Sequence, residues 1–378
     1  MPATWAAFLH DPNANRLADL NAFESFDLVR VENGVGALTL TLPYSAVPYS
    51  YWKRDGLITL ERTPPAGGSP ALFLEQVYFI TGRRRKIDDD GAQRVIITAQ
   101  DANGLLRRRA VLYAAGTSQA DKTDNAGDVM RAIVRENLGA SASASRQIAA
   151  LTVGSDLGDG ASVSKAFAWR NVLQVLQELA QASVTAGTYI AFDLVCTTQP
   201  GAGTLGLEFR TYASQRGQDH RYPSGAAGPV LLGPDFGTLA GADYGEDFAD
   251  EINYVTALGQ GEGAARVTAN SSDTTRSGSS PYALCEATVD ARNTASSTAV
   301  QDEADGALRA GLPARLFSAQ VVDTAGVRFG VEYSWGDYLT AQAFGDSFDC
   351  RLPAVRVRHD GSGEKISAVL KNDSSTYA

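Results

Sequence analysis

The sequence predicts a mainly β protein that carries an α+β insert. Glycine (37 residues) far outnumbers proline (14), and 44% of the 378 residues are hydrophobic while 20% are charged, a balance typical of a loop-rich β protein. The N-terminal region alternates apolar and polar residues with the period of a strand, whereas the middle of the chain spaces its apolar residues as helices do. A chain of this length is expected to form two to four domains.

The N-terminal region is expected to form a meander of about six strands, in a small barrel or sandwich. Leu28–Glu32 and Leu38–Leu42 predict a hairpin, because the Asn33-Gly34 pair between them tolerates the positive φ angles of tight turns. Leu38, Leu40 and Leu42 should face one core. Three further strands are expected at Gly56–Arg62, Phe73–Arg84 and Arg94–Gln100.

The run Asp88-Asp89-Asp90-Gly91 allows two interpretations. Clustered carboxylates suggest calcium, but the run lacks the spaced oxygen ligands and the closing Glu of an EF-hand loop. A hairpin turn is favoured, because Asp and Gly both prefer turns.

The stretch Val95–Arg109 passes from a strand pattern to an acidic residue and then to an apolar pair followed by three arginines. Asp101 and Asn103 are expected to end the strand, because short polar side chains bond nearby backbone and favour turns. Arg107–Arg109 are either a solvated charge run or a surface that docks onto an acidic neighbouring subunit.

An α+β insert is expected from Arg108 to Ser214. Asn125–Leu138 spaces its apolar residues as one helix, which Gly139 ends. Asn171 is expected to cap a second helix that ends at Gly187. Strands should follow at Tyr189–Val195 and Leu205–Tyr212.

The C-terminal region returns to strands. Asn253–Leu258 leads into Gly259-Gln-Gly-Glu-Gly263, which resembles a phosphate-binding loop but lacks the helix that such a loop requires, so a tight β turn is favoured. A helix is expected within Thr294–Gly311. The final hairpin should pair Val355–Arg358 with Ile366–Leu370 across Asp360–Gly363.

Three motifs together resemble a known family. They are the strand ending at Asp101 with the Leu-Leu-x-x-Arg that follows it, the helix Asp128-Val-Met-Arg-Ala-Ile-Val-Arg-Glu-Asn-Leu138, and Tyr333-Ser-Trp-Gly-Asp337 before a strand. The chain is similar to siphovirus-type bacteriophage tail proteins of the baseplate or tail-tip hub (Gp37-like tail proteins). The resemblance implies two hub-type β-barrel tube domains, residues 1–107 and 215–378, that flank an α/β domain of residues 108–214.

The same resemblance implies a structural protein of the virion. Three copies would form a ring that continues the sixfold tail tube, since two barrels per copy resolve the symmetry mismatch. The implied partners are the distal tail protein, the tape measure protein and tail fibres or a central spike, and no cofactor is implied. The ring would be assembled in the host bacterial cytoplasm, and DNA would pass through its lumen without specific binding.

Composition restricts the other function classes. The net charge of −10 and the pI of about 4.9 argue against a dedicated nucleic-acid binder, although acidic lumen walls would keep DNA from sticking. In that arrangement the basic runs Arg83–Lys86 and Arg107–Arg109 should point outward or into subunit contacts. No run approaches the length of a membrane span, and Met1–His10 lacks the features of a secretory signal.

The cysteines and histidines predict no disulfide framework, zinc site or catalytic triad, because they are too far apart in sequence. They are Cys196, Cys285, Cys350, His10, His220 and His359.

Two alternative functions are a cell-wall hydrolase and a receptor-binding tip module. The hydrolase would use a carboxylate pair from an acidic cluster, but no group of aromatic residues flanks that cluster as a sugar platform. The receptor-binding module would show repeated aromatic β units, whereas the aromatics here are scattered. We therefore expect no enzymatic activity, with no catalytic, cofactor-binding or metal-binding residues. The acidic cluster comprises Asp243, Glu246, Asp247, Asp250 and Glu251.

Overall fold

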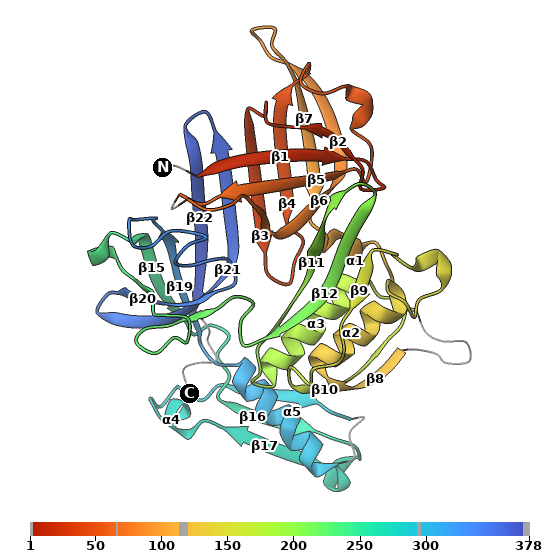
Figure 1. Ribbon diagram of the computed structural model, residues 1–378. Coiled ribbons are helices and arrows are strands. Elements are labelled where there is room, and N and C mark those ends of the chain that lie inside the picture. The colour runs from red at the N-terminus through yellow and green to blue at the C-terminus, as the bar shows by residue number, and fades with distance from the viewer. Residues whose placement is uncertain (1–2, 66, 113–119, 293–295, 373–378) are drawn as a thin grey trace.

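The computed structural model describes residues 3–65, 67–112, 120–292 and 296–372. Figure 1 shows a large β sheet, an α+β insert beside it and a small α/β unit below both. The predicted mainly β class is confirmed. None of the helices in the described part of the chain has the length and apolar character needed to cross a membrane.

The N-terminal β region contains every strand predicted for it, and the hairpin around Asn33 is confirmed. Two further strands, β1 and β2, were not predicted. The elements are β1 (Thr4–His10), β2 (Arg16–Asp19), β3 (Ser25–Val31), β4 (Ala37–Pro43), the 3-10 turn η1 (Tyr49–Tyr51), β5 (Leu57–Thr63), β6 (Ala71–Ile87), β7 (Gln93–Gln100) and α1 (Gly104–Arg107).

The C-terminal β region ends in the predicted hairpin, which is formed by its two longest strands. The strand predicted after the Tyr333–Asp337 motif is also present. The elements are β13 (Asp219–His220), β14 (Leu231–Leu232), η3 (Pro234–Phe236), β15 (Leu239–Asp247), β19 (Ala314–Val321), β20 (Tyr338–Ala343), β21 (Asp346–Asp360) and β22 (Gly363–Asn372).

The two β regions form one continuous sheet of 14 strands. They join where β21 pairs antiparallel with β3, with Ala354 opposite Val31 and His359 opposite Phe26. Eight strands follow one another across this join in the order β15-β19-β22-β21-β3-β4-β7-β6. Segments more than 300 residues apart in sequence therefore lie side by side at the centre of the molecule.

The two halves of this sheet repeat one topology. From the outer end inward, the N-terminal half runs β6-β7-β4-β3; from the join outward, the C-terminal half runs β21-β22-β19-β15. The four strands of each half can be numbered in chain order, as β3, β4, β6 and β7 in one half and β15, β19, β21 and β22 in the other. Both halves then have the spatial order third, fourth, second, first. The third strands are also alike, because the first part of β6 pairs with the preceding strand β5 and the first part of β21 pairs with the preceding strand β20.

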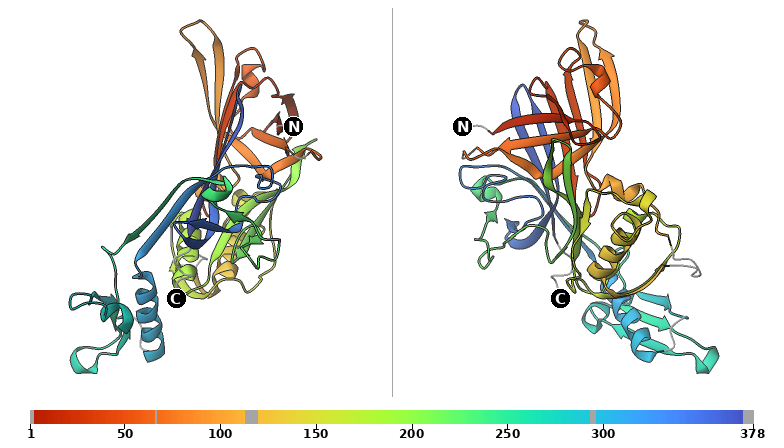
Figure 2. Two further views of the ribbon diagram at one scale, coloured as in Figure 1. Left: turned by 90° about the vertical axis from the view of Figure 1, so that its left-hand side faces the viewer. Right: turned by 45° about the vertical axis from the view of Figure 1, so that its right-hand side comes forward.

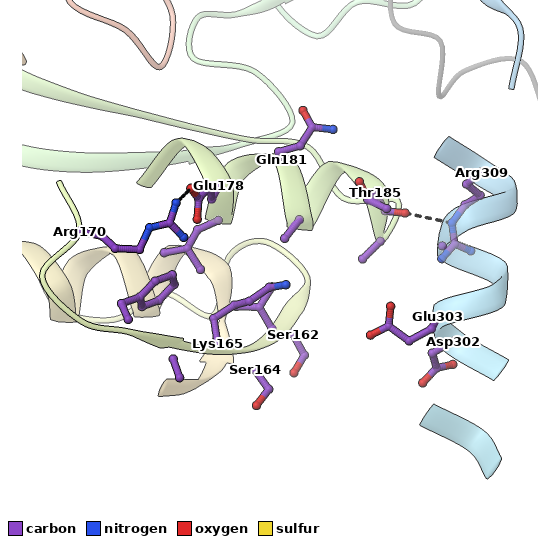
Figure 3. A pocket seen from close by; sticks show the side chains of 17 residues that line it. Ser162, Ser164, Lys165, Arg170, Glu178, Gln181, Thr185, Asp302, Glu303 and Arg309 are labelled. Atoms are coloured by element: carbon purple, nitrogen blue, oxygen red, sulfur yellow. Dashed lines mark hydrogen bonds and ion pairs between the residues drawn. The ribbon is translucent and has the colours of Figure 1, made fainter. Parts of the chain in front are cut away.

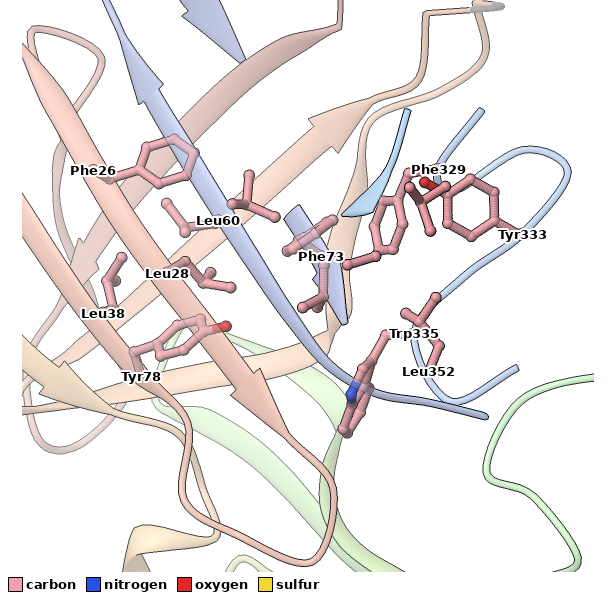
Figure 4. Close-up of a cluster of buried hydrophobic side chains, with 14 of the residues drawn as sticks. Phe26, Leu28, Leu38, Leu60, Phe73, Tyr78, Phe329, Tyr333, Trp335 and Leu352 are labelled. Atoms are coloured by element: carbon pink, nitrogen blue, oxygen red, sulfur yellow. The ribbon is translucent and has the colours of Figure 1, made fainter. Parts of the chain in front are cut away.

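One face of the sheet carries a shared hydrophobic core. The predicted alternation in β4 is confirmed, since Leu38, Leu40 and Leu42 are all buried there. Figure 4 shows side chains from both β regions meeting in this core, among them Phe73 and Phe329. The alternate residues, such as Thr39 and Arg356, are exposed on the opposite face, which we call the open face.

The insert packs two helices against a three-stranded sheet around a second core, to which Leu57, Val77 and Phe79 of the N-terminal β region also contribute. Asn171 caps the second helix as predicted, by accepting a hydrogen bond from the Gln174 backbone N–H at 3.4 Å. The elements are β8 (Ala120–Asn125), α2 (Ala126–Asn137), η2 (Ala144–Arg146), β9 (Leu151–Val153), β10 (Ser162–Phe167), α3 (Val172–Thr185), β11 (Ile190–Gly201) and β12 (Thr204–Ala213).

A small unit interrupts the C-terminal β region between β15 and β19, which lead out to it and back (Figure 2). It has a separate small core around Val255 and Val300. The glycine run lies in the loop of the β16–β17 hairpin, but the predicted tight turn is wrong, because this loop spans residues 259–267 and contains a 3-10 turn. The Arg266 side chain stabilises the loop by donating to the Gly259 carbonyl at 3.1 Å. The elements are β16 (Tyr254–Leu258), η4 (Gly263–Ala265), β17 (Thr268–Ser272), α4 (Thr274–Ser277), β18 (Glu286–Asp290) and α5 (Ser297–Ala310).

Candidate functional site

A buried ionic junction joins the three main parts of the chain. Arg30 of β3 is fully buried and donates to Asp193 of β11 at 2.9 and 3.0 Å. Its other terminal nitrogen contacts Asp101, which follows β7. Arg216, after β12, donates to the same Asp193 carboxylate at 3.0 Å. Two arginines and two aspartates therefore balance in charge at the centre of the molecule, which allows them to remain buried.

Trp335 closes this junction from the C-terminal β region. The guanidinium carbons of Arg30 and Arg216 lie 4.3 and 4.2 Å from the centre of its ring, within the range of cation–π attraction. Its indole N–H donates to the Pro353 carbonyl at 3.2 Å. The junction thus fixes the N-terminal β region, the insert and the C-terminal β region relative to one another.

Burial controls the titration of Asp101. It raises the pKa of this carboxyl to about 6, against the lowering effect of Arg30. The Gly36 backbone N–H, 2.7 Å away, also stabilises the charged form. Asp101 is therefore mostly ionised at neutral pH and becomes protonated under mildly acidic conditions.

The sequence interpretation of Asp101 and Asn103 was incomplete. Both residues follow the end of β7 as predicted, but they are buried and link different parts of the chain. The Asn103 side chain donates to the Gly34 carbonyl at 2.8 Å and accepts from the Leu194 backbone N–H at 2.8 Å. A signal was present in the sequence, because Arg30 stands at an apolar-face position of its strand and so requires a buried acidic partner.

The helix of the second motif contains another buried ion cluster. Arg131 of α2 donates to Asp128 at 2.9 Å and to Asp159 at 2.8 Å. Asp128 also accepts from the Leu157 and Gly158 backbone N–H groups, which holds their loop on the helix. These motif residues stabilise the insert.

The third motif is also structural. The Asp337 carboxylate accepts from the backbone N–H groups of Ser334 at 2.6 Å and Gln218 at 2.7 Å, and the Tyr333 hydroxyl donates to Asp323 at 2.7 Å. Burial raises the pKa of Asp337. The motif therefore positions Trp335 over the two junction arginines.

The two basic runs differ in their contacts. Arg107 donates to Gln100 and Arg108 pairs with Asp55, so the first two arginines of the run Arg107–Arg109 bind residues of their own chain. On β6, Arg83 and Arg85 lie over the ring of Tyr49 on the core side of the sheet. The side chains between and beyond them, Arg84 and Lys86, lie on the open face, since they pair with Ile96 and Arg94 of β7.

The acidic cluster is distributed along β15 and the segment after it. Asp243, Asp247 and Asp250 are exposed. The other two members are ion-paired, Glu246 to Arg315 at 3.1 Å and Glu251 to Arg276 at 2.8 Å.

The described residues contain no group of three or more His, Cys, Asp or Glu side chains that could hold a metal ion. The Asp88–Gly91 run forms the predicted turn between β6 and β7, closed by the Gly91 N–H to Asp88 carbonyl bond. Cys196 and Cys350 are buried free thiols, and burial raises the pKa of Cys196 to about 11.

An open cleft of about 840 Å³ separates the insert from the small unit. Figure 3 shows β10 and α3 on one side and α5 on the other. Arg170 pairs with Glu178 within the insert, and Arg309 of α5 donates to the Thr185 carbonyl at 3.1 Å across the gap. Acidic and basic side chains both line the cleft. Few contacts across it hold the small unit against the insert.

Three of the solved structures that resemble this chain are tail proteins, two of them from prophages. The tail protein from Neisseria meningitidis MC58 matches with a TM-score of 0.57 at 14% identity, over 98% of this chain and 97% of that one. The 43 kDa tail protein of prophage MuSo2 from Shewanella oneidensis gives a TM-score of 0.57 at 10% identity, over 99% and 100%. Prophage tail protein gp18 from Listeria monocytogenes EGD-e gives 0.55 at 12% identity, over 98% and 95%. This chain therefore has the fold of a phage tail protein.

The family is also established. The family model for Siphovirus ReqiPepy6 Gp37-like protein matches residues 6–370, so this chain belongs to that family of siphovirus tail proteins. The resemblance found in the sequence motifs is thereby confirmed. A search of the curated proteins finds no match.

Proposed function

We propose that this tail protein is the hub of the baseplate or tail tip. Three copies form a ring that continues the tail tube, anchors the tip proteins and leaves a channel for DNA ejection. The observation that carries the proposal is the repeated topology of the sheet, in which each copy presents two equivalent four-stranded units. Three copies then present six units, which matches a sixfold tube at one end and a threefold tip at the other.

The division into residues 1–107, 108–214 and 215–378 forms part of this proposal. The first and third segments supply the two tube domains, each a partial barrel that other copies complete. The insert and the small unit lie to one side of the sheet in Figure 1, where they are placed to bind neighbouring tail proteins. The partners we propose are the distal tail protein, the tape measure protein and tail fibres or a central spike.

We propose that the open face of the sheet lines the channel. Its strands carry small and polar side chains, such as Thr39, Thr98 and Ser318, together with the exposed apolar side chains of Val31, Leu316 and Val369. Arg356 and Arg358 share Asp27 at the centre of this face. Charge on this face is therefore mixed rather than strongly acidic, which revises the acidic lining suggested by net charge. Asp27 offsets one of these two positive charges, and the hydroxyl groups around them are uncharged, so the face offers few sites for phosphate to bind.

A density map of the tail tip tests the proposal. We expect three copies of this chain in one ring coaxial with the tube. A map with a single copy, or with six equivalent copies in the tube itself, would overturn it. A wall hydrolase or a receptor-binding module would instead lie outside the ring, at the tip surface.

A further inference from the structure

The eight-stranded run of the sheet ends in two unpaired strand edges. Across the residues that the structure describes, β15 pairs with β19 alone. At the other end, β5 accompanies β6 only as far as Ile80, so Gly82–Ile87 pairs with β7 on one side and, among the described residues, with no strand on the other. Unpaired edges of this length are sites at which other strands add.

These two edges carry opposite charge on the same face. Asp243 and Asp247 of β15 lie on the open face, because they pair with positions of β19 that alternate with the buried Phe317. Arg84 and Lys86 of β6 lie on the open face at the other end. An edge of one sign repels a second copy of itself and attracts the opposite edge, which favours a head-to-tail ring over a twofold dimer.

The chain already contains one example of such a contact. In the β21–β3 join, the second part of a third strand pairs with a first strand. Arginines of the third strand meet an aspartate of the first on the open face: Arg356 donates to Asp27 at 2.8 Å and Arg358 donates to it at 3.2 Å. β6 and β15 occupy the equivalent positions in the repeat, and they carry the same signs of charge.

Strand direction is also compatible. Every neighbouring pair among the eight strands is antiparallel, so with an even number of strands the two edge strands run in opposite directions. Two copies in the same orientation therefore bring β15 and β6 together antiparallel, and the alternation continues from one copy to the next.

We infer that β15 of one copy pairs antiparallel with Gly82–Ile87 of β6 in the next copy, with Asp243 and Asp247 facing Arg84 and Lys86. This contact repeats between copies what the β21–β3 join does within one copy. The inference identifies the two surfaces that close the ring, and it therefore rests on the proposed hub function.

Charge reversal in assembled tails tests the contact. The β6 variant is Arg84→Glu with Lys86→Glu, and the β15 variant is Asp243→Arg with Asp247→Arg. Each should lower the number of assembled tails seen by electron microscopy roughly tenfold or more, because like charges then oppose each other across neighbouring strands. The variant with all four substitutions should recover assembly, since the edges again attract. Asp250→Arg, the same type of substitution at one exposed position just beyond β15, should assemble as the wild type does.

A cross-link identifies the occupant of the edge. Arg84→Cys with Asp243→Cys, in a Cys285→Ser background, should give covalent oligomers of this chain in tails treated with a short bis-maleimide. A link to a different tail protein would overturn the inference. Normal assembly of both charge-reversal variants would also overturn it. So would failure of the variant with all four substitutions to assemble although circular dichroism shows that it is folded. A wild-type map without a three-copy ring would instead overturn the proposed function itself.

Discussion

The buried junction and the charged strands of the open face both use arginine and aspartate, but in different roles. In the junction, Arg30, Asp101 and Asp193 have no access to solvent, and each charge depends on the others. On the open face, Asp27 and Arg356 are partly solvated, and the charges at the two sheet edges lack a partner strand. Burial thus decides whether a charge fixes the parts of one chain or remains available to another chain. Four predictions test this contrast.

The largest effect is expected at the junction. Arg30→Met should lower the free energy of unfolding by about 3–5 kcal/mol, because it leaves two buried carboxylates with only Arg216 to balance them. Urea unfolding of the full chain measures this loss. Arg356→Met, an equal change on the open face, is the control and should cost less than ~1 kcal/mol. Similar losses for the two variants would abolish the distinction.

The pH dependence of Asp101 should be the next largest effect. Its pKa in the folded chain, about 6, is above the value of 3.8 for the unfolded chain, so ionisation costs stability as pH rises between these values. Wild type should therefore lose about 2–3 kcal/mol between pH 4 and pH 7 relative to Asp101→Asn, which lacks this ionisation. Unfolding curves of both proteins at the two pH values measure the difference; a difference that stays constant would contradict the raised pKa.

A smaller effect is expected at the β21–β3 join. The hydrogen bond from Arg356 holds the pKa of Asp27 below its usual value. The pair therefore stabilises the fold at pH values above the usual pKa of an aspartate, and this contribution is lost as pH falls through the lowered pKa. Asp27→Asn should cost about 0.5–1 kcal/mol at pH 7 and less at pH 3. Thermal unfolding at both values checks the sign, and a larger cost at pH 3 would refute it.

The smallest effect is expected in the acidic cluster. Single changes of Asp243, Glu246, Asp247 and Asp250 to Asn or Gln should alter the free energy of unfolding by about 0.5 kcal/mol or less, since exposed charges contribute little. Glu251→Gln, which weakens the half-buried ion pair with Arg276, should cost about 1 kcal/mol. Any wall-degrading activity of the particle should remain unchanged. Loss of hydrolysis by tails that still assemble would identify a catalytic carboxylate instead.

Local pattern was enough to predict most elements of the fold. The alternation of Leu38, Leu40 and Leu42, the Asn171 cap and the turn at Gly91 each depend on neighbours in sequence, and each was confirmed. The order of the strands was not predictable in this way, because it depends on pairing between segments as distant as β3 and β21.

The candidate site was less predictable than the fold. Asp101 was singled out only as a residue that ends a strand, and Arg30 and Asp193 were not singled out, since the residues of that ion pair are 163 positions apart. The relation between the two halves was hidden as well. β3 alternates buried and partly exposed residues, whereas β15 is exposed along most of its length, so the repeat exists in topology without a matching sequence pattern.

The β21–β3 join also constrains how the chain can be made. Residues 26–31 are synthesised more than 300 residues before their pairing partner, residues 354–359. Until that partner is made, the nascent chain carries an open β3 edge, which in a crowded cell can pair with other nascent chains. The central pairing of the sheet therefore has a high contact order, which slows the folding of each copy.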